Sequence, residues 1–291
     1  GGNTYCTREH DSLKISNGKW CWFSRGIGGK TALDYLIKVK ELPFTEAVER
    51  IVGRAAERPS VFHARAQPEK PKTLLLPPKS NSNTRVIAYL KSRSIDGGLI
   101  EQCIRSGQLY ESLPHHNAVF VGMDRNGTLR YACLRGIGTD FKGEATGSDK
   151  RFSFALPATG ESRMLCVFES AIDLLSYATM AQAGGLSWRS QHLLSLAGVY
   201  KPQKETQEHR LPLALTQYLK DHAEIKTICL CLDNDMTGRS ATEAIRQQLA
   251  ERYKVASAFP RQGKDYNDWL CIRMGLQPAK ENPMTERSFA R

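Results

Sequence analysis

The sequence predicts an α/β protein whose C-terminal half forms a parallel β-sheet with flanking helices. Short apolar runs alternate with helical patterns from residue 162 to about residue 270. Repeated βα units of this length indicate a parallel sheet with right-handed crossovers. The clearest run, Ile228–Leu232, is apolar throughout, as in a strand buried on both faces, and it stops abruptly at Asp233-Asn234-Asp235.

The composition is that of a globular protein with an excess of basic residues. The 291 residues, 41% of them hydrophobic and 24% charged, allow about two domains and a sizeable core. The net charge of +11 favours a polyanionic partner, although a solvated basic surface is the alternative. Residues 1–160 contain 24 Lys and Arg against 15 Asp and Glu, and residues 161–291 contain 17 against 15. The basic surplus therefore lies in the first half.

The chain shows no membrane signal. It has no apolar run of 18 residues and no apolar segment of a signal peptide at its start, so we expect no transmembrane helix and no membrane partner. Its eight cysteines are scattered, and Cys229 and Cys231 lie inside the predicted buried strand. This usage suits a reducing cytoplasm better than a disulfide framework, so we expect a cytoplasmic location.

Residues 1–57 are predicted to form a small α+β module. Leu13–Ile15 and Trp20–Phe23 read as two strands joined by a turn at Asn17-Gly18. Two helices follow, over residues 31–40 and over Phe44–Ala55. In the second helix, Thr45 is the predicted N-cap, and Ala47, Val48 and Ile51 are the predicted buried residues.

The aromatic residues of this module have two interpretations. Trp20, Trp22 and Phe23 either fill the core or stack on bases of a single-stranded nucleic acid. In the second case they lie beside the basic residues Arg8, Lys19 and Arg25. We expect at least one of the two tryptophans to belong to the core.

The module resembles the zinc-binding domain of bacterial replicative primases. The likeness rests on a strand hairpin ending in aromatic residues, a Gly-rich turn, the helix ALDYL and the segment FTEAVERIVG. That family binds zinc through two ligand pairs. In this chain Trp22 and Arg25 replace the second pair, and Cys6 and His10 stand one residue too far apart for the first. Because Cys21 would make only a third ligand and a closed structural site needs four, we expect no zinc.

Residues 58–83 have the composition of a linker, being rich in Pro, Ser, Asn and basic residues. Residues 84–160 are then predicted to form a basic α+β segment. Its predicted elements are two helices, over residues 84–93 and Leu99–Ser106, and a hairpin of Asn117–Met123 and Thr128–Arg135.

This middle segment resembles the part of primases that precedes their metal-binding core. The similar phrases are YLKSRSID, AVFVGMDRNGTLRYACLRG and GSDKRFSF. The resemblance implies a sheet surface with basic residues along the path of template and nucleotide. It singles out Arg135, Lys150 and Arg151 as residues that hold phosphate. A solvent-facing charge is the alternative for each of them.

Residues 161–270 carry carboxylates at the ends of predicted strands. Glu169 follows the strand Met164–Phe168, and Asp233 and Asp235 follow the strand Ile228–Leu232. The carboxyl ends of parallel strands meet at one edge of a sheet, where open α/β sheets bind ligands. Three carboxylates at one edge repel each other unless a cation binds, so their positions favour a metal site. Taken alone, Asp-x-Asp is equally consistent with a turn that caps a helix.

The same region resembles the toprim fold of primases, topoisomerases and related nucleases. The similar pieces are CVFESAID, SLAG, CLDNDMTGR and GKDYNDWL. The resemblance implies that Glu169 is the acid/base or metal-linked residue and that Asp233 and Asp235 are metal ligands. It also implies Mg²⁺ or Mn²⁺ as cofactor, with Asp173 and Asp265 as further acidic positions of the metal site.

The chain departs from the toprim pattern at two positions. The family's later motif reads Asp-x-Asp, but here Asn267 takes the second place, which argues against a second fully charged metal site. Ser170 replaces the glycine that commonly follows the glutamate. Lys264 and Arg239 are the nearby cations expected to contact phosphate; alternatively, Arg239 pairs with Glu243 and Lys264 is an ordinary surface residue.

The order of these segments implies a function. A zinc-domain-like module, a linker, a basic segment and a toprim domain together resemble primase-like proteins of bacterial plasmids and integrative elements. We therefore expect a nucleotidyltransferase that uses single-stranded DNA and nucleoside triphosphates, with a helicase or another replication or transfer protein as a possible partner. A toprim nuclease and a non-catalytic accessory protein that binds single strands are the alternatives. Residues 271–291 are polar, with two prolines, and predict an exposed tail.

Overall fold

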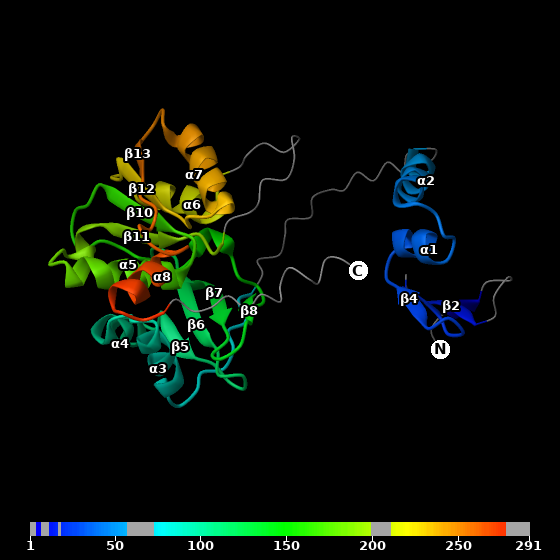
Figure 1. Cartoon of the computed structure of the whole chain (residues 1–291), viewed down its shortest axis with the longest axis horizontal. Coiled ribbons are helices and arrows are strands. Elements are labelled where there is room, and N and C mark those ends of the chain that lie inside the picture. The colour runs from blue at the N-terminus through cyan, green and yellow to red at the C-terminus, as the bar shows by residue number, and fades with distance from the viewer. Residues whose placement is uncertain (1–3, 7–11, 17–18, 57–72, 199–210, 278–291) are drawn as a thin grey trace. The chain divides into compact units, whose positions relative to one another are not determined.

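The structure, a computed structural model, describes residues 4–6, 12–16, 19–56, 73–198 and 211–277 (Figure 1). The chain divides into two compact units, residues 1–69 and residues 70–291. His10, Arg8 and the predicted turn at Asn17-Gly18 lie outside the described residues. The fold class is α/β, as the sequence predicts.

The first unit is an antiparallel sheet followed by two helices. Its strands pair in the order β1-β2-β3-β4. The elements are β1 (Thr4–Cys6), β2 (Leu13–Ser16), β3 (Lys19–Trp22), β4 (Ile27–Gly29), α1 (Ala32–Lys38) and α2 (Phe44–Ala56). Because α2 begins at Phe44, Thr45 lies inside the helix and is not its N-cap.

Both tryptophans of the first unit belong to its core. Trp20 and Trp22 are 6% and 5% exposed and pack with Leu13, whereas Phe23 is 68% exposed. The guanidinium of Arg25 lies 4.2 Å from the centre of the Trp22 ring. Of the aromatic residues proposed to stack on bases, only Phe23 is therefore open to solvent. On α2, Ala47 is buried, but Ile51, predicted to be buried, is exposed.

The second unit begins with two helices and an antiparallel sheet, paired in the order β5-β6-β7-β8. The elements are α3 (Thr84–Ser92), α4 (Gly97–Arg105), β5 (Leu109–Glu111), β6 (Ala118–Met123), β7 (Leu129–Arg135), β8 (Lys142–Glu144) and the 3-10 turn η1 (Lys150–Phe152). Segment 73–83, inside the predicted linker, lies against this sheet, with β-bridges Leu75–Thr146 and Lys79–Ser112. Its Leu74 and Leu76 pack on the sheet with Val119 and Val121.

A five-stranded sheet follows, in the order β13-β12-β10-β11-β9. Four of its strands are parallel, and β9 is an antiparallel edge strand that the sequence did not predict. Its strands and helices are β9 (Ala155–Leu156), β10 (Met164–Phe168), α5 (Ala171–Ala183), η2 (Trp188–Ser190), β11 (His192–Ser195), α6 (Leu213–Asp221), β12 (Thr227–Cys231), α7 (Met236–Leu249), β13 (Lys254–Ser257) and α8 (Tyr266–Arg273).

Helices cover both faces of this sheet. Because alternate residues of a strand point to opposite sides, each strand contributes side chains to two cores. On β10, Leu165 and Val167 join the core formed with α6 and α7. Cys166 and Phe168 join the other core, which contains α5 and α8 and extends to residues of the antiparallel sheet such as Phe120. The two sheets of the second unit thus share one core. Among the described residues, no helix is both long and apolar enough to span a membrane.

Candidate metal and nucleotide site

Two neighbouring parallel strands bring carboxylates to one edge of the five-stranded sheet. Strands β10 and β12 pair with Phe168 opposite Cys231. Glu169 follows the first strand directly, and Asp233 lies two residues beyond the second. The Asp233 backbone N–H donates to Glu169 Oε1 over 3.2 Å. Register and backbone therefore place the first two predicted catalytic residues side by side.

Each of the three helices that start at this edge is capped by a side chain of the predicted site or its neighbour. Ser170 caps α5 by accepting from the Asp173 N–H, at 3.3 Å. Asp235 caps α7 through the Gly238 N–H, at 2.8 Å. Asp265 caps α8 through the Asp268 N–H, at 2.7 Å. The cap interpretation of Asp-x-Asp is thus correct for Asp235, and it is compatible with metal binding because a carboxylate has two oxygens.

Gly238 is the residue that lets α7 start so close to Glu169. A Cβ at this position would lie 2.2 Å from the Asp233 carbonyl oxygen and 2.9 Å from Glu169 Oε1. The first distance joins the Cβ to backbone, which has little room to move. Only glycine therefore fits between the two carboxylate-bearing strand ends.

The carboxyl groups are crowded and partly removed from water. Burial, followed by the charges of Asp173 and Glu169, raises the pKa of Asp233 to about 8. Burial, followed by the charge of Asp265, raises the pKa of Asp173 to about 7. The pKa values of Glu169 and Asp265 are also raised, chiefly by burial. Burial is the first cause in each case and neighbouring carboxylates add to it, so the ionised forms are disfavoured unless a cation compensates their charge.

Lys264 lies among these acids. Its Nζ is 3.5 Å from Asp235 Oδ2 and 4.0 Å from Asp233 Oδ2. Its backbone carbonyl accepts from the Asn234 N–H at 2.7 Å, which ties the loop before α8 to the loop after β12. Arg239 hydrogen-bonds to Asn234 and lies over the Phe259 ring, while Glu243 pairs with Arg246 instead. The alternative considered for Arg239, an ion pair with Glu243, is therefore not formed between these two described residues.

Asn267 has a structural role that an aspartate cannot fill. The residue is 4% exposed. Its amide nitrogen donates to the Arg93 carbonyl and to Ser176 Oγ, both at 3.0 Å, and its oxygen accepts from Arg93 Nη1 at 2.8 Å. Its backbone N–H approaches Asp173 Oδ1 at 3.4 Å. The departure from Asp-x-Asp therefore fixes α8 to the end of α3 and leaves no second carboxylate there.

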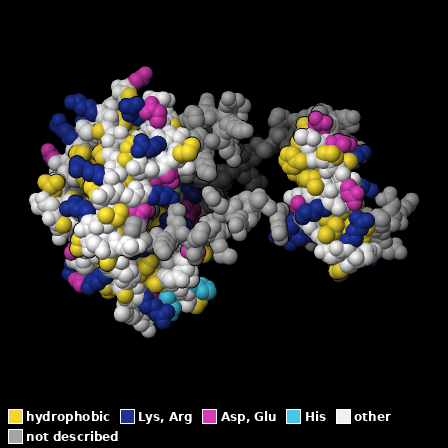
Figure 2. Space-filling view, in the orientation of Figure 1, with side chains coloured by type: hydrophobic (Ala, Val, Ile, Leu, Met, Phe, Trp, Pro, Cys, Tyr) yellow, Lys and Arg dark blue, Asp and Glu magenta, His cyan; other side chains and the backbone are white. Residues whose placement is uncertain are grey.

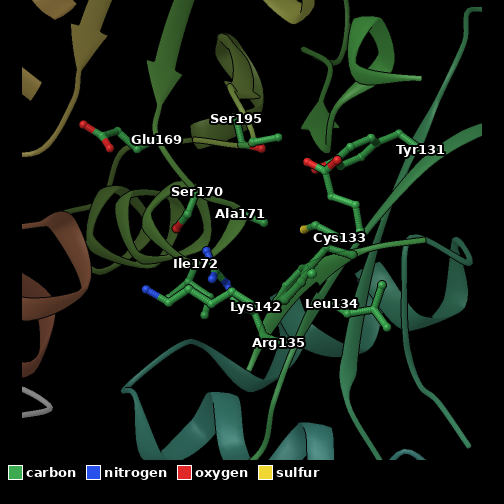
Figure 3. Close-up of a pocket in the computed structure, with 14 residues that line it drawn as sticks. Tyr131, Cys133, Leu134, Arg135, Lys142, Glu169, Ser170, Ala171, Ile172 and Ser195 are labelled. Carbon is green, nitrogen blue, oxygen red and sulfur yellow. The ribbon is translucent and has the colours of Figure 1, made fainter. Parts of the chain in front are cut away.

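A cavity of about 390 Å³ joins this edge to the antiparallel sheet. Glu169, Ser170 and Ser195 line it from one side, and Arg135 and Lys142 line it from β7 and β8 (Figure 3). The two basic residues are register partners on neighbouring strands. Lys142 was not predicted from sequence because β8 is three residues long and contains Gly143, so it gives no strand pattern.

The other two predicted phosphate ligands do not line this cavity; each pairs with a carboxylate, and one of these, Glu144, lines the cavity. Arg151 forms a two-point ion pair with Asp149, with an Nη2–Oδ2 distance of 2.6 Å. Lys150 pairs with Glu144 at 2.9 Å. Of the three residues of the middle segment that were predicted to hold phosphate, Arg135 alone lines the cavity with Glu169.

The donor set at the sheet edge fits Mg²⁺ or Mn²⁺, because it consists of carboxylate oxygens with water access. The described residues also contain two sets of three ligand-type side chains with ligand atoms within 4.8 Å of one another. These are Cys166, Cys229 and Cys231, and His192, His222 and Glu224; neither contains the acids of the edge, nor Cys6 or Cys21. In the described part of the chain, no three of the edge acids therefore bring their ligand atoms within 4.8 Å of one another.

Comparison with known proteins agrees with this geometry. Residues 166–270 match the family described as Toprim-like, and residues 88–160 match a protein family of unknown function, DUF3991. The first match spans Glu169, Asp233 and Asp265 at the sheet edge. Residues 166–270 form a Toprim-like domain.

Longer relatives extend beyond the Toprim-like domain. The chain is 25% identical over 257 residues to the uncharacterized protein pXO2-78 of Bacillus anthracis, covering 83% of this chain and 70% of that protein. It is 24% identical over 287 residues to a 65 kDa protein of Zymomonas mobilis, covering 91% of this chain. This chain spans 46% of the Zymomonas protein.

Two solved structures are similar in outline. The primase fragment of the bacteriophage T7 primase-helicase protein is 18% identical, with a TM-score of 0.44, over 91% of this chain and 90% of that one. The E. coli primase catalytic core is 15% identical, with a TM-score of 0.42, over 67% of this chain and 70% of that one.

The stability of the metal-free chain should fall with rising pH because of Asp233. A carboxyl whose pKa is raised by folding stabilises the native state at low pH and loses that contribution as the pH rises from about 4 to about 8. We expect Asp233→Asn to raise the midpoint of thermal unfolding in EDTA by several degrees at pH 8.5, and by less at pH 5. If the thermal midpoints of the variant and the wild type differed by the same amount at both pH values, the proposed repulsion among the carboxylates would be contradicted.

Asn267→Asp should destabilise the second unit by about 2 kcal/mol, because the new carboxylate cannot donate to the Arg93 carbonyl or Ser176 and is buried near Asp173. Asn126→Asp makes the same chemical change at an exposed turn and should alter the free energy of unfolding by less than about 0.5 kcal/mol. Urea unfolding of both variants measures the difference. Equal stabilities would show that the amide network contributes nothing.

Proposed function

We propose that the chain is a primase-like nucleotidyltransferase that joins nucleotides on a single-stranded DNA template with divalent metal at the Toprim-like site. The observation that carries the proposal is the cavity with Glu169 on one side and the basic pair Arg135 and Lys142 on the other. Such a site can hold a cation and a nucleotide phosphate at the same time. The sequence resemblance to primases, from the first module through to the toprim motifs, supports this reaction over others.

The proposed roles of the residues rest on their positions at the sheet edge and in the cavity. Glu169, Asp233 and Asp235 would hold Mg²⁺ or Mn²⁺, with Asp173 and Asp265 as the acids behind them. A bound divalent ion supplies Lewis-acid stabilisation of the phosphate charge that develops during the transfer. Lys264, 3.5 Å from Asp235, is placed to contact a phosphate bound beside these acids. Arg135 and Lys142 would orient the triphosphate or the template backbone by charge-assisted hydrogen bonds.

Partners are proposed on the same basis. Lys and Arg side chains are spread over the visible faces of the units rather than gathered in one patch (Figure 2). A broad basic surface suits a nucleic-acid backbone, which is bound without regard to sequence. We propose single-stranded DNA and nucleoside triphosphates as ligands, in the replication or transfer of a mobile element, with a helicase or another replication protein as partner.

The decisive experiment incubates the full chain with single-stranded template, labelled nucleoside triphosphates and Mg²⁺ or Mn²⁺. We expect extension products, and a loss of at least about 100-fold for Glu169→Gln and Asp233→Asn, because both remove a proposed metal-binding carboxylate. Glu161→Gln and Asp140→Asn make the same changes at exposed positions and should keep full activity. A shortened template would instead identify a nuclease, and binding without turnover would identify an accessory protein.

Substitution of Arg135 or Lys142 should change the KM for nucleoside triphosphate, an effect separable from loss of the metal site. Arg135→Ala and Lys142→Ala should each raise the KM for nucleoside triphosphate about tenfold, because each removes a charge-assisted hydrogen bond to phosphate. Arg130→Ala is the matched control, since Arg130 lies on the same strand but pairs with Asp124 at 2.8 Å. Steady-state kinetics measure the values. If the control raised the KM as much as Arg135→Ala, the cavity would have no special role.

A further inference from the structure

A second cluster of ligand-type side chains lies at the opposite end of the parallel strands, where these strands begin. It consists of His192, His222 and Glu224, whose ligand atoms lie within 4.8 Å of one another. His192 opens β11, and the other two residues lie in the turn between α6 and β12. These are the amino-terminal ends of parallel strands, whereas Glu169 and Asp233 follow the carboxyl ends of β10 and β12. The two clusters are therefore separate.

The imidazole of His192 has one unused nitrogen. The residue is 3% exposed, and its buried Nε2 makes no hydrogen bond of normal geometry, although the Ser162 backbone lies close enough to act on the ring. That atom points at the cluster, with Glu224 Oε1 at 3.8 Å, which is too long for a hydrogen bond. A buried polar atom without a partner is unusual in a folded protein and calls for a missing one.

The other ring nitrogen of His192 is held by the protein. Its Nδ1 lies 3.0 Å from the Tyr218 hydroxyl and makes a longer contact, 3.4 Å, with the Ala158 N–H. If Nδ1 carries the proton and donates to Tyr218, Nε2 presents a lone pair to the cluster, and the longer contact to Ala158 is given up. A histidine that binds a metal typically donates its second ring N–H in this way.

His222 and Glu224 complete the set from the accessible side. His222 Nδ1 lies 3.0 Å from Glu224 Oε1. The His222 ring stacks on Tyr218, with ring centres 4.3 Å apart, and the Ile225 N–H donates to the His222 carbonyl over 3.2 Å, which closes the turn. Glu224 is 48% exposed, so an ion can enter from solvent. Stacking and turn thus fix the histidine while the carboxylate remains free to adjust.

The spacing of the ligand atoms matches a tetrahedral ion. Bonds of about 2.0–2.2 Å in a tetrahedron separate neighbouring ligand atoms by about 3.4 Å. The two distances to Glu224 Oε1, 3.0 Å from His222 and 3.8 Å from His192, lie on either side of this value. Two imidazoles and one carboxylate suit zinc-class divalent ions, whereas Mg²⁺ prefers oxygen ligands alone.

We propose that His192, His222 and Glu224 bind one zinc-class divalent ion, with water as the fourth ligand. The ion links the start of β11 to the turn before β12 and so fastens the amino-terminal edge of the Toprim-like domain. This proposal departs from the sequence-based expectation that the chain holds no zinc, which concerned the N-terminal module. It is independent of the proposed nucleotidyltransferase activity.

The test uses the full chain without a histidine tag, stripped with EDTA and kept in excess Mg²⁺ to occupy the carboxylate edge. Zn²⁺ binding is measured by competition with a chromophoric chelator. We expect one equivalent of Zn²⁺ and a rise in the thermal midpoint on its addition. His222→Gln and Glu224→Gln should weaken the affinity by at least about tenfold. The exposed substitutions His115→Gln and Glu161→Gln should leave it unchanged.

Substitution with Co²⁺ identifies the donor atoms. Visible bands of tetrahedral Co²⁺ without a thiolate charge-transfer band, lost in His222→Gln, would support the proposal. A thiolate band would place the ion at Cys166, Cys229 and Cys231, or in the N-terminal module, and would overturn it. So would the absence of Zn²⁺ uptake, or equal affinity in wild type and Glu224→Gln. Thermal unfolding in EDTA checks that both variants fold as the wild type does.

Discussion

The second unit is organised around carboxylates that its topology forces together. Parallel pairing of β10 with β12 sets Glu169 and Asp233 at the same edge, and α8 brings Asp265 to it. These groups repel one another, and burial increases the repulsion because it removes the water that would screen them. When no cation is bound, protonation of Asp233, whose pKa is raised to about 8, removes part of this charge, and groups of the fold itself compensate another part.

Part of the compensation comes from backbone N–H groups and helix ends. Glu169 accepts from the Asp233 N–H, and the caps of α5, α7 and α8 all lie at this edge. The amino-terminal end of a helix carries a partial positive charge, so three such ends stabilise neighbouring carboxylates. Lys264 adds a full charge, at 3.5 Å from Asp235. Asp235 and Asp265 thus serve as caps with one oxygen and can bind a ligand with the other.

The sequence predicts most of the βα frame because its strands are apolar runs and its helices begin at recognisable caps. It misses β1, β4, β5, β8 and β9, which have two or three residues each and depend on pairing with other strands. The same limit applies to the site. Glu169 and Asp233 stand at strand ends and can be found from the pattern, whereas Lys142 enters the cavity only because β8 pairs with β7. Part of the predicted linker lies against the sheet through isolated bridges, which leave no periodic signal.

Asn267 affects both the negative charge of the sheet edge and the packing of α8 against α3. A carboxylate at this position would add to the repulsion around Asp173, which is 6% exposed and already has a raised pKa. The amide avoids that charge and uses its two N–H groups to bind the Arg93 carbonyl and Ser176. Asparagine in place of aspartate therefore reduces the negative charge at the edge and joins α8 to α3. The partly exposed acids Glu169, Asp233 and Asp235 remain at this edge, where we propose that the ion binds.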